Sequence, residues 1–490
     1  MNKLRVCLVA LLTPLAALAQ SPAPGSAAPQ LALKECRVEG APVQGKCGVF
    51  EVPEDRANPN GRKLGLKVVI IPALARVPEA DPLFLFAGGP GQAATDAFGP
   101  LIGALERVRK KRDLVLIDQR GTSSSSTLYC NVDDKKATLA ERMAAGAFPK
   151  DKLEACLKKN PADPRFYTTS IAMQDMDDAR AALGYSTINL WGGSYGTRAA
   201  LVYLREHGEH VRSVVLDGVA PLTMRVPLYF ARDAQRAITL LFESCAKDAS
   251  CNKAFPDLKA RFDALLTKLE KEPAKVKVND PLTGEPTELT IGRETFAGLF
   301  RGELYAPELA VLVPLTIDRA IKGDFAPFVA QGMTLSRGMA KGMSLALMLS
   351  VLCAEDLPRT PKAEIEAVSA GTFLGPHAVM EFADACAYWP HADIPAAFHE
   401  PVKSDKPVLL LSGELDPVTP PSWAEEAKRT LSNSVHAVAP GVGHGVTSVG
   451  CAPNVVGKFI ETASTKDLDE GCLARSTRPP FFVSFAGPTP

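Results

Sequence analysis

The chain has 490 residues, of which 46% are hydrophobic and 22% are charged, a composition typical of folded globular proteins. Its 55 Lys and Arg residues balance its 55 Asp and Glu residues, so the net charge favours neither nucleic acid nor an anionic membrane as a partner. A single compact core rarely reaches this length, which predicts two domains or one large domain with an insertion.

The first residues have the pattern of an export signal. Two basic residues precede an apolar run over 6–17, and residues 17–19 read Ala-Leu-Ala, a small-x-small cleavage site. We therefore expect a signal peptide over 1–19, a flexible N-terminus over 20–35, and a mature protein in the periplasm or outside the cell. A membrane anchor is the alternative, but the apolar run is short for one.

Ten cysteines remain after that cleavage, an even number that favours disulfides in an exported protein. The simplest pairing joins each cysteine to its neighbour in sequence, as Cys36–Cys47, Cys130–Cys156, Cys245–Cys251, Cys353–Cys386 and Cys451–Cys472. A metal site is the rival interpretation. No C-x-x-C pair or H-x-x-x-H spacing supports it, so we expect no metal and no other cofactor.

Short apolar runs that alternate with helical patterns predict a mostly parallel α/β sheet with helices on both faces. The expected strands are 46–52, 64–71, 82–86, 114–117, 187–191, 211–216, 407–411 and 435–438, and helices are expected at 170–183 and 452–465. Between 221 and 400 the pattern is largely helical, with a polar hairpin at 275–290, which predicts an inserted helical lid. The core is then built from 36–220 and 401–490, the second part including the C-terminal tail.

A candidate nucleophile lies where one of these strands meets a helix. Residues 192–196 read Gly-Gly-Ser-Tyr-Gly and join the apolar run to a helical pattern, the setting that a G-x-S-x-G nucleophile turn requires. The motif alone is weak, because it arises by chance in roughly one chain of this length in five or six. Glycines on both sides leave room for the turn, and Ser194 would lie at a helix N-terminus, where the dipole favours negative charge.

Two further candidates, Asp416 and His444, follow later strands and complete the Ser, Asp, His chain order of the α/β-hydrolase fold. The carboxyl ends of parallel strands share one edge, so the three side chains should meet. A serine needs a base to become a nucleophile, histidine exchanges protons near neutral pH, and a buried carboxylate holds the imidazole in one tautomer. Asp217 is a rival acid, and Asp416 alternatively caps a turn. His207 and His210 resemble an exposed helix end.

An oxyanion hole requires two backbone N–H groups aimed at the developing negative charge. Tyr195, directly after the serine, supplies one. The Gly-Gly-Pro-Gly loop at 88–91 follows an early strand and is placed to supply the other. Pro90 has no N–H, which favours Gly89, although a simple tight turn is the alternative.

These motifs resemble those of the proline iminopeptidase and tripeptidyl aminopeptidase family of α/β-hydrolase serine peptidases. The matching segments are GGPG at 88–91, DQRGT at 118–122, DMDDARAALGY at 175–185, GGSYGT at 192–197, SGELDPVTP at 412–420 and GVGHG at 441–445, with 304–307 and 320–324 in the lid. The resemblance covers most of 45–465. It implies Ser194 as the nucleophile, Asp416 as the acid, His444 as the base, and Gly89 and Tyr195 as the oxyanion donors.

The chain also departs from this family. Ala87 stands where the family often has His, and Ser123–Ser126 stand where it often has Gly-x-Ser, so the mouth of the pocket could differ. The family typically binds the free α-amino group of its substrate with lid carboxylates, which implies Glu355 as an amine ligand, because a buried ammonium needs an anion. A solvent-exposed acidic turn is the alternative for Glu355.

We therefore expect an exported serine aminopeptidase that releases N-terminal residues or short peptides through an acyl-Ser194 intermediate. The expected substrates are short peptides or small esters, with no nucleic-acid partner and no membrane after signal cleavage. No oligomeric state follows from these patterns. Two alternatives stay open: a carboxylesterase acting on small esters, because fold and triad do not define the acyl group, and a hydrolase-like binding module without catalysis.

Overall fold

A computed structural model describes residues 31–122, 128, 130, 138–144, 146, 148–280, 283–340 and 342–488. The expected signal peptide, residues 20–30 of the expected flexible N-terminus and the Ser123–Ser126 segment lie outside these residues.

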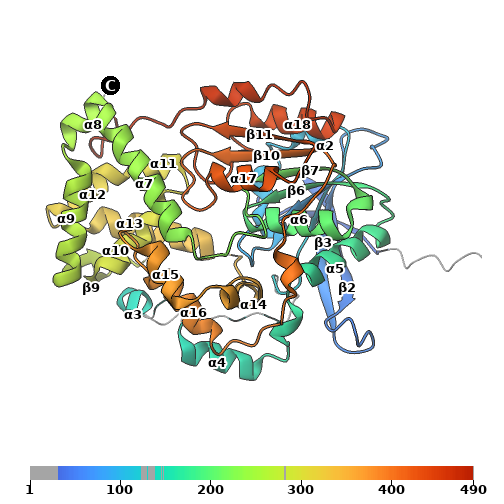
Figure 1. Cartoon of the computed structure of the whole chain (residues 1–490), viewed down its shortest axis with the longest axis horizontal. Coiled ribbons are helices and arrows are strands. Elements are labelled where there is room, and N and C mark those ends of the chain that lie inside the picture. The colour runs from blue at the N-terminus through green and yellow to red at the C-terminus, as the bar shows by residue number, and fades with distance from the viewer. Residues whose placement is uncertain are drawn as a thin grey trace, which may run out of the picture. The chain divides into compact units, whose positions relative to one another are not determined.

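A nine-stranded sheet organises the described chain (Figure 1). Its strands lie in the order β1 (Lys34–Arg37), β2 (Gln44–Pro53), β3 (Lys63–Ile71), β5 (Leu114–Ile117), β4 (Leu83–Phe86), β6 (Ile188–Gly193), β7 (Val211–Asp217), β10 (Val408–Gly413) and β11 (Ser434–Ala439). The six strands from β5 to β11 pair in parallel, whereas β1, β2 and β3 pair antiparallel at one edge. The expected mostly parallel sheet is confirmed.

Helices cover both faces of this sheet (Figure 1). One face carries α5 (Thr169–Ala182), α6 (Tyr195–Glu206) and α17 (Pro421–Lys428), and the other carries α1 (Ala94–Ala97), α2 (Glu106–Arg109) and α18 (Ala452–Thr462). In β4, Phe84 and Phe86 pack on the α6 side, while Leu83 and Leu85 pack on the α18 side. Burial of both faces explains why these strands are continuous apolar runs in the sequence.

The edge strand β1 was not expected from the sequence. Its residues, Lys-Glu-Cys-Arg, lack the alternation of apolar and polar side chains that identifies a half-buried strand. Pairing with β2 and the Cys36–Cys47 disulfide hold it in the sheet. Residues 34 and 35, expected in the flexible N-terminus, therefore belong to the sheet.

The segment between β7 and β10, residues 218–407, is called here the helical insertion. It contains α7 (Phe230–Lys247), α8 (Ala249–Ala254), α9 (Leu258–Lys271), α10 (Arg293–Glu303), α11 (Pro307–Ala310), α12 (Val313–Ile321), α13 (Ala326–Ala340), α14 (Leu345–Glu355), α15 (Lys362–Ser369) and α16 (His377–Cys386). Strands β8 (Ala274–Asn279) and β9 (Pro286–Ile291) form the expected hairpin. Two short helices, α3 (Leu139–Ala144) and α4 (Lys150–Lys159), precede α5. Among the helices of the described residues, none combines the length and hydropathy that a membrane crossing needs.

The helical insertion packs in two parts. Helices α7 to α13 enclose a hydrophobic cluster of their own, in which Phe262 and Phe296 are fully buried. Helices α14 and α16 instead join the core of the sheet, for example through Leu349. The C-terminal tail returns to the first part, where Phe481 is buried. The expected lid spans 221–400. Of this range, the part that forms α7 to α13 has a core separate from the sheet, whereas α14 and α16 pack on the sheet.

All ten cysteines that the structure describes are paired. The five bridges are Cys36–Cys47, Cys130–Cys156, Cys245–Cys251, Cys353–Cys386 and Cys451–Cys472. The pairing of sequence neighbours is confirmed, and each bridge closes a short segment rather than joining distant parts of the fold.

Two glycines determine how closely α6 packs on the sheet. A Cβ atom at Gly192 would lie 2.2 Å from the carbonyl oxygen of Gly196, and a Cβ at Gly196 would lie 2.0 Å from that of Phe86. Both gaps are too short for any side chain, because the obstructing atoms belong to the backbone. The glycines of the G-x-S-x-G motif are thus required by packing between β4, β6 and α6.

We predict that Gly196→Ala destabilises the protein by about 3 kcal/mol, because the added methyl group must displace the backbone of β4. Gly298→Ala is the matched control. Gly298 is exposed within α10 and a Cβ there meets nothing within 4 Å, so alanine should be neutral or stabilise by up to about 1 kcal/mol. Urea unfolding with the disulfides intact measures both; equal stabilities for the two variants would contradict the packing argument.

Candidate active site

Ser194 occupies a strained turn between β6 and α6. Its backbone has φ 56° and ψ −126°, a conformation that costs a residue other than glycine on the order of 1–3 kcal/mol. The turn is held because Ser194 N–H donates to the carbonyl oxygen of Asp217 at 2.9 Å and Thr197 N–H donates to that of Ser194 at 2.9 Å. The structure thus presents the serine at the carboxyl end of the sheet, before the first turn of α6.

The candidate acid and base meet at the same edge, after β10 and β11. His444 Nδ1 lies 2.8 Å from Asp416 Oδ2, where an Nδ1–H group donates to the carboxylate. The other oxygen, Asp416 Oδ1, accepts the N–H groups of Val418 and Thr419, each at 2.8 Å. The two interpretations of Asp416 therefore hold together, since one oxygen caps the turn and the other orients the imidazole.

Burial and pairing shift the pKa values of this pair in opposite directions. Burial alone raises the pKa of Asp416, but the neighbouring His444 and the backbone donors outweigh burial, so the pKa of Asp416 is lowered. Burial alone lowers the pKa of His444, and the charge of Asp416 outweighs it, so the pKa of His444 is raised. Asp416 is fully buried and His444 is 16% exposed, which leaves the imidazole as the accessible member of the pair.

Asp217, the rival acid, holds the loop that follows the histidine. Its carboxylate accepts the N–H groups of Val446 at 2.8 and 3.0 Å and of Thr447 at 2.8 Å. Within the described residues it forms no hydrogen bond to the imidazole of His444. Asp416 is therefore the carboxylate that the geometry assigns to His444, and Asp217 fixes the direction of the chain beyond it.

Ser194 and His444 line one cavity of about 530 Å³, together with residues of the helical insertion. Among the described residues the Ser194 hydroxyl forms no hydrogen bond to the imidazole. Catalytic hydrogen bonds of this kind often shorten only in the substrate complex. The structure brings Ser194, the candidate nucleophile, to the same cavity as His444, which Asp416 contacts from behind, and proton transfer between them belongs to the proposal below.

The candidate oxyanion donors lie beside the nucleophile. A Cβ at Gly88 would lie 3.1 Å from the Cβ of Ser194, so the 88–91 loop lies directly against the serine. Gly89 has φ +108°, which strongly favours glycine there. In the described part of the chain, neither Gly89 N–H nor Tyr195 N–H donates to another group. Both N–H groups are therefore without an acceptor in the described residues, in segments that adjoin Ser194.

Glu355 lies behind the cavity wall. Its carboxylate is fully buried and accepts Thr169 N–H at 2.7 Å and the Thr169 hydroxyl at 2.9 Å. That hydroxyl is in turn 2.7 Å from the hydroxyl of Tyr195, the residue after the nucleophile. The solvent-exposed acidic turn considered for Glu355 is wrong. Burial raises its pKa to about 7, although Arg198 and Thr169 oppose this shift.

Arg198 connects this buried carboxylate to the cavity. Its guanidinium donates to Asp356 Oδ2 at 2.7 Å, lies 3.7 Å from Glu355 Oε2, and forms part of the cavity wall. Two carboxylates at the end of α14 therefore balance one arginine of α6. This ion cluster attaches the second part of the helical insertion directly behind the nucleophile.

Tyr305 and Arg301 are wall residues to which the sequence assigned no role. Tyr305 belongs to a segment noticed only through the family resemblance, and its carbonyl oxygen accepts His444 N–H at 2.8 Å. Its ring packs edge-on against the imidazole, with centroids 5.2 Å apart, and its hydroxyl accepts from Arg301 at 2.9 Å. The helical insertion thus contacts the candidate base directly.

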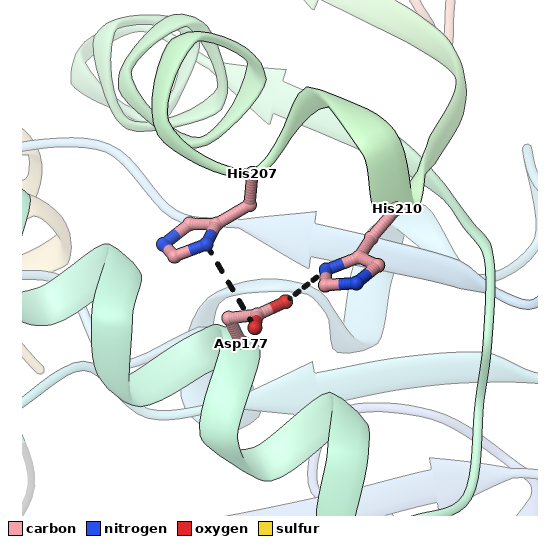
Figure 2. A group of neighbouring side chains, drawn as sticks. All are labelled: Asp177, His207 and His210. Carbon is pink, nitrogen blue, oxygen red and sulfur yellow. Dashed lines mark hydrogen bonds and ion pairs between the residues drawn. The ribbon is translucent and has the colours of Figure 1, made fainter.

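A separate cluster joins Asp177 of α5 to His207 and His210 (Figure 2). Each imidazole turns its Nδ1 atom toward the carboxylate, at 3.8 Å for His207 and 2.8 Å for His210. His207 follows the last residue of α6, as expected, but the expected exposure is wrong, because the side chains of His207 and His210 are only 12% and 28% exposed. The Arg180 guanidinium already lies 2.7 Å from Asp177, so a divalent cation would have to displace a cation. The arrangement favours a polar contact that joins α5 to the end of α6, rather than a metal site.

Two family models match the chain. The model described as "alpha/beta hydrolase fold" matches residues 81–251, which include the nucleophile turn. The model described as "TAP-like protein" matches residues 372–472, which include Asp416 and His444. Residues 252–371, which contain most of the helical insertion, lie between the two matches.

The curated relatives include peptidases and an esterase. The chain is 25% identical over 471 residues to "Tripeptidyl aminopeptidase" of Streptomyces coelicolor, covering 90% of this chain and 84% of that one. It is 30% identical to "Serine protease Hip1" of Mycobacterium tuberculosis over 222 residues, or 42% of each chain, so it matches less than half of that protease. It is 28% identical to "Carboxylesterase B" of the same species over 313 residues, or 59% of this chain and 58% of that one.

We predict that Asp416→Asn moves the acidic limb of the pH profile to lower pH. Protonated His444 cannot accept a proton from Ser194, so kcat/KM falls as the pH drops through the pKa of His444, which Asp416 raises. The substitution should also lower kcat by about 10⁴-fold through loss of the correct tautomer. Hydrolysis of a p-nitrophenyl ester between pH 5 and 9 tests both effects. An unmoved limb, or an equal effect of Asp217→Asn, would contradict the assignment.

Proposed function

We propose, since the chain belongs to the tripeptidyl aminopeptidase family of α/β-hydrolase serine peptidases, that it is an exported aminopeptidase that releases short N-terminal peptides through an acyl-Ser194 intermediate. The observation that carries this proposal is the common cavity wall of Ser194 and His444, with His444 oriented by Asp416 at 2.8 Å. A binding module without catalysis would not require this arrangement.

The reaction begins when Ser194 Oγ attacks the scissile carbonyl carbon and its proton moves to His444 Nε2. Because Nδ1–H is engaged by Asp416, Nε2 is the nitrogen left free to accept. The carbonyl oxygen becomes an oxyanion and accepts the N–H groups of Gly89 and Tyr195, at the positive end of α6.

His444 then gives its proton to the leaving amine as the C–N bond breaks, and the acyl group stays on Ser194 as an ester. Water enters, and His444 removes one of its protons as the oxygen attacks the ester carbon. Collapse of the second tetrahedral intermediate releases a carboxylic acid and returns the proton to Ser194 Oγ.

The cavity favours short, unfolded substrates. Its wall includes apolar side chains of the helical insertion, such as Phe230 and Met348. A folded protein cannot bring a peptide bond into such a space, whereas a chain terminus can. Glu355, expected as a ligand of the substrate amine, is fully buried, is bonded to Thr169 and is not among the residues that line the cavity. This proposal therefore gives it an indirect role, in which its carboxylate supports the position of Thr169.

The disulfides support the proposed export. Five bridges in one chain are typical of proteins that fold outside the reducing cytoplasm. The expected signal peptide would deliver the chain to such a compartment, and its cleavage would remove Cys7, the one cysteine outside the described residues.

An esterase is the second candidate function, favoured by the similarity to Carboxylesterase B and by the apolar cavity. The same nucleophile and base would serve both reactions, so the difference lies in the leaving group and in recognition of the substrate amine.

We predict that a fluorophosphonate probe labels the wild-type protein and fails to label Ser194→Ala, because only an activated serine attacks phosphorus at a useful rate. Ser170→Ala, a change of a hydroxyl that is bonded to Glu206 at 2.8 Å, is the control and should label fully. Mass spectrometry of the labelled peptide locates the adduct. An unlabelled wild-type protein would leave the binding module as the better account.

We also predict that a tripeptide amide reporter with a free N-terminal amine is hydrolysed at least about tenfold faster, in kcat/KM, than its N-acetylated form, because acetylation removes the charge that an aminopeptidase recognises. Esters of the same two peptides serve as controls. Because an ester loses its leaving group more easily than an amide, their hydrolysis shows whether the serine is active even where the amides are not cleaved. Turnover of both amides at equal rates, or of the esters alone, would favour the esterase.

A further inference from the structure

The cavity wall carries an arginine that forms no ion pair with a carboxylate of the described residues. Among the described residues, the arginines that line the cavity are Arg198 and Arg301, and each has a buried Nε without an acceptor there. Arg198 is balanced by Asp356 at 2.7 Å and Glu355 at 3.7 Å. Arg301 forms no ion pair with any carboxylate in the described part of the chain.

Two acids near Arg301, one in the cavity wall and one in its own helix, form no ion pair with it among the described residues. Asp217 also lines the cavity, but its oxygens accept the N–H groups of the loop after His444. Glu303 follows two positions later on α10, and residues at this spacing do not share a helix face. The Glu303 carboxylate is buried and has no hydrogen-bond partner among the described residues, and burial raises its pKa to about 8, which keeps it largely neutral near pH 7.

The Arg301 side chain is nevertheless held in a defined orientation. Its guanidinium lies 4.3 Å from the centroid of the Phe230 ring and 5.5 Å from that of Tyr305, and one of its N–H groups donates to the Tyr305 hydroxyl at 2.9 Å. Two aromatic faces and one hydrogen bond restrict the group, while Nε–H is left without an acceptor. A buried donor without a partner is costly, and a planar guanidinium matches a carboxylate with two parallel donors.

The location of Arg301 indicates which part of a substrate would meet it. Tyr305, which accepts from Arg301, packs edge-on against His444, the residue that protonates the leaving amine in the proposed reaction. Arg301 therefore lies on the His444 side of the cavity. The fragment that departs as an amine occupies this side, whereas the acyl fragment stays attached to Ser194.

We propose that Arg301 binds a carboxylate of the leaving fragment, either its C-terminal carboxylate or an acidic side chain. This inference rests on the proposed peptidase function and adds a selectivity for anionic leaving fragments. Short peptides that end within the cavity would satisfy it directly, so the enzyme would prefer oligopeptides with a free C-terminus close to the cleaved bond.

The test uses two pairs of peptides. The members of the first pair share one sequence and end in either a free carboxylate or an amide. The members of the second pair are both amidated and carry either Glu or Gln in the leaving fragment. Wild-type enzyme should hydrolyse the anionic member of at least one pair about tenfold faster in kcat/KM, the effect of one charge-assisted hydrogen bond. A preference in the first pair identifies the C-terminal carboxylate, and a preference in the second identifies the side chain.

The variants are judged by the ratio of rates within each pair, so a general loss of activity cancels. Arg301→Gln should bring the ratio to about one, and Arg301→Lys should keep part of it, because lysine retains the charge without the planar fork. Arg319→Gln is the control. Arg319 also belongs to the helical insertion but pairs with Asp324. The rate ratios of the Arg319→Gln variant should equal those of the wild-type enzyme.

Equal rates within both pairs for the wild-type enzyme, or an anionic preference that survives Arg301→Gln, would overturn the Arg301 proposal. A neutral tripeptide amide reporter separates this outcome from failure of the proposed function. Turnover of that reporter with no anionic preference rejects only the carboxylate site, whereas no turnover of any peptide rejects the peptidase itself.

Discussion

The contact between backbones around the nucleophile turn is the constraint on which the site depends. Because Gly196 lies against the carbonyl of Phe86 and Gly192 against that of Gly196, β4, β6 and α6 can approach only where no side chain intervenes. That approach forces the strained conformation of Ser194, places Tyr195 N–H at the start of α6, and sets the 88–91 loop beside the serine. The strain is sustained by the surrounding sheet, in which neighbouring strands are buried on both faces.

Charges close to the turn follow a consistent pattern. Each of three buried carboxylates at the site accepts hydrogen bonds: Asp416 from His444 and a turn, Asp217 from the loop beyond His444, and Glu355 from Thr169. Such pairing offsets the cost of removing charge from water and makes each carboxylate a rigid support. Arg301 is the exception, because it lines the cavity but forms no ion pair with a carboxylate of the described residues.

The sequence predicted those features that depend on local pattern. Continuous apolar runs located the buried strands, glycine spacing located the nucleophile turn, and the order of Ser194, Asp416 and His444 indicated the edge where the structure brings them together. Features that depend on distant partners were missed. The polar strand β1 is recognisable only beside β2, and the helical pattern of the insertion did not reveal that α14 packs on the sheet. Glu355 could be nominated only by resemblance, and its bonds to Thr169, 186 positions earlier, leave no mark in a local window.

The hydrogen bond from His444 N–H to the Tyr305 carbonyl has a consequence for evolution and engineering. A Cβ at Gly443 would lie 2.3 Å from the same carbonyl oxygen, so the histidine loop and the segment at 305 are fitted to one another at the level of main-chain atoms. The helical insertion is therefore not a cap that can be exchanged freely between homologous enzymes. A transplanted insertion must place a carbonyl oxygen where that of Tyr305 accepts the His444 N–H group. Without this acceptor, the new insertion would change the specificity and also displace His444.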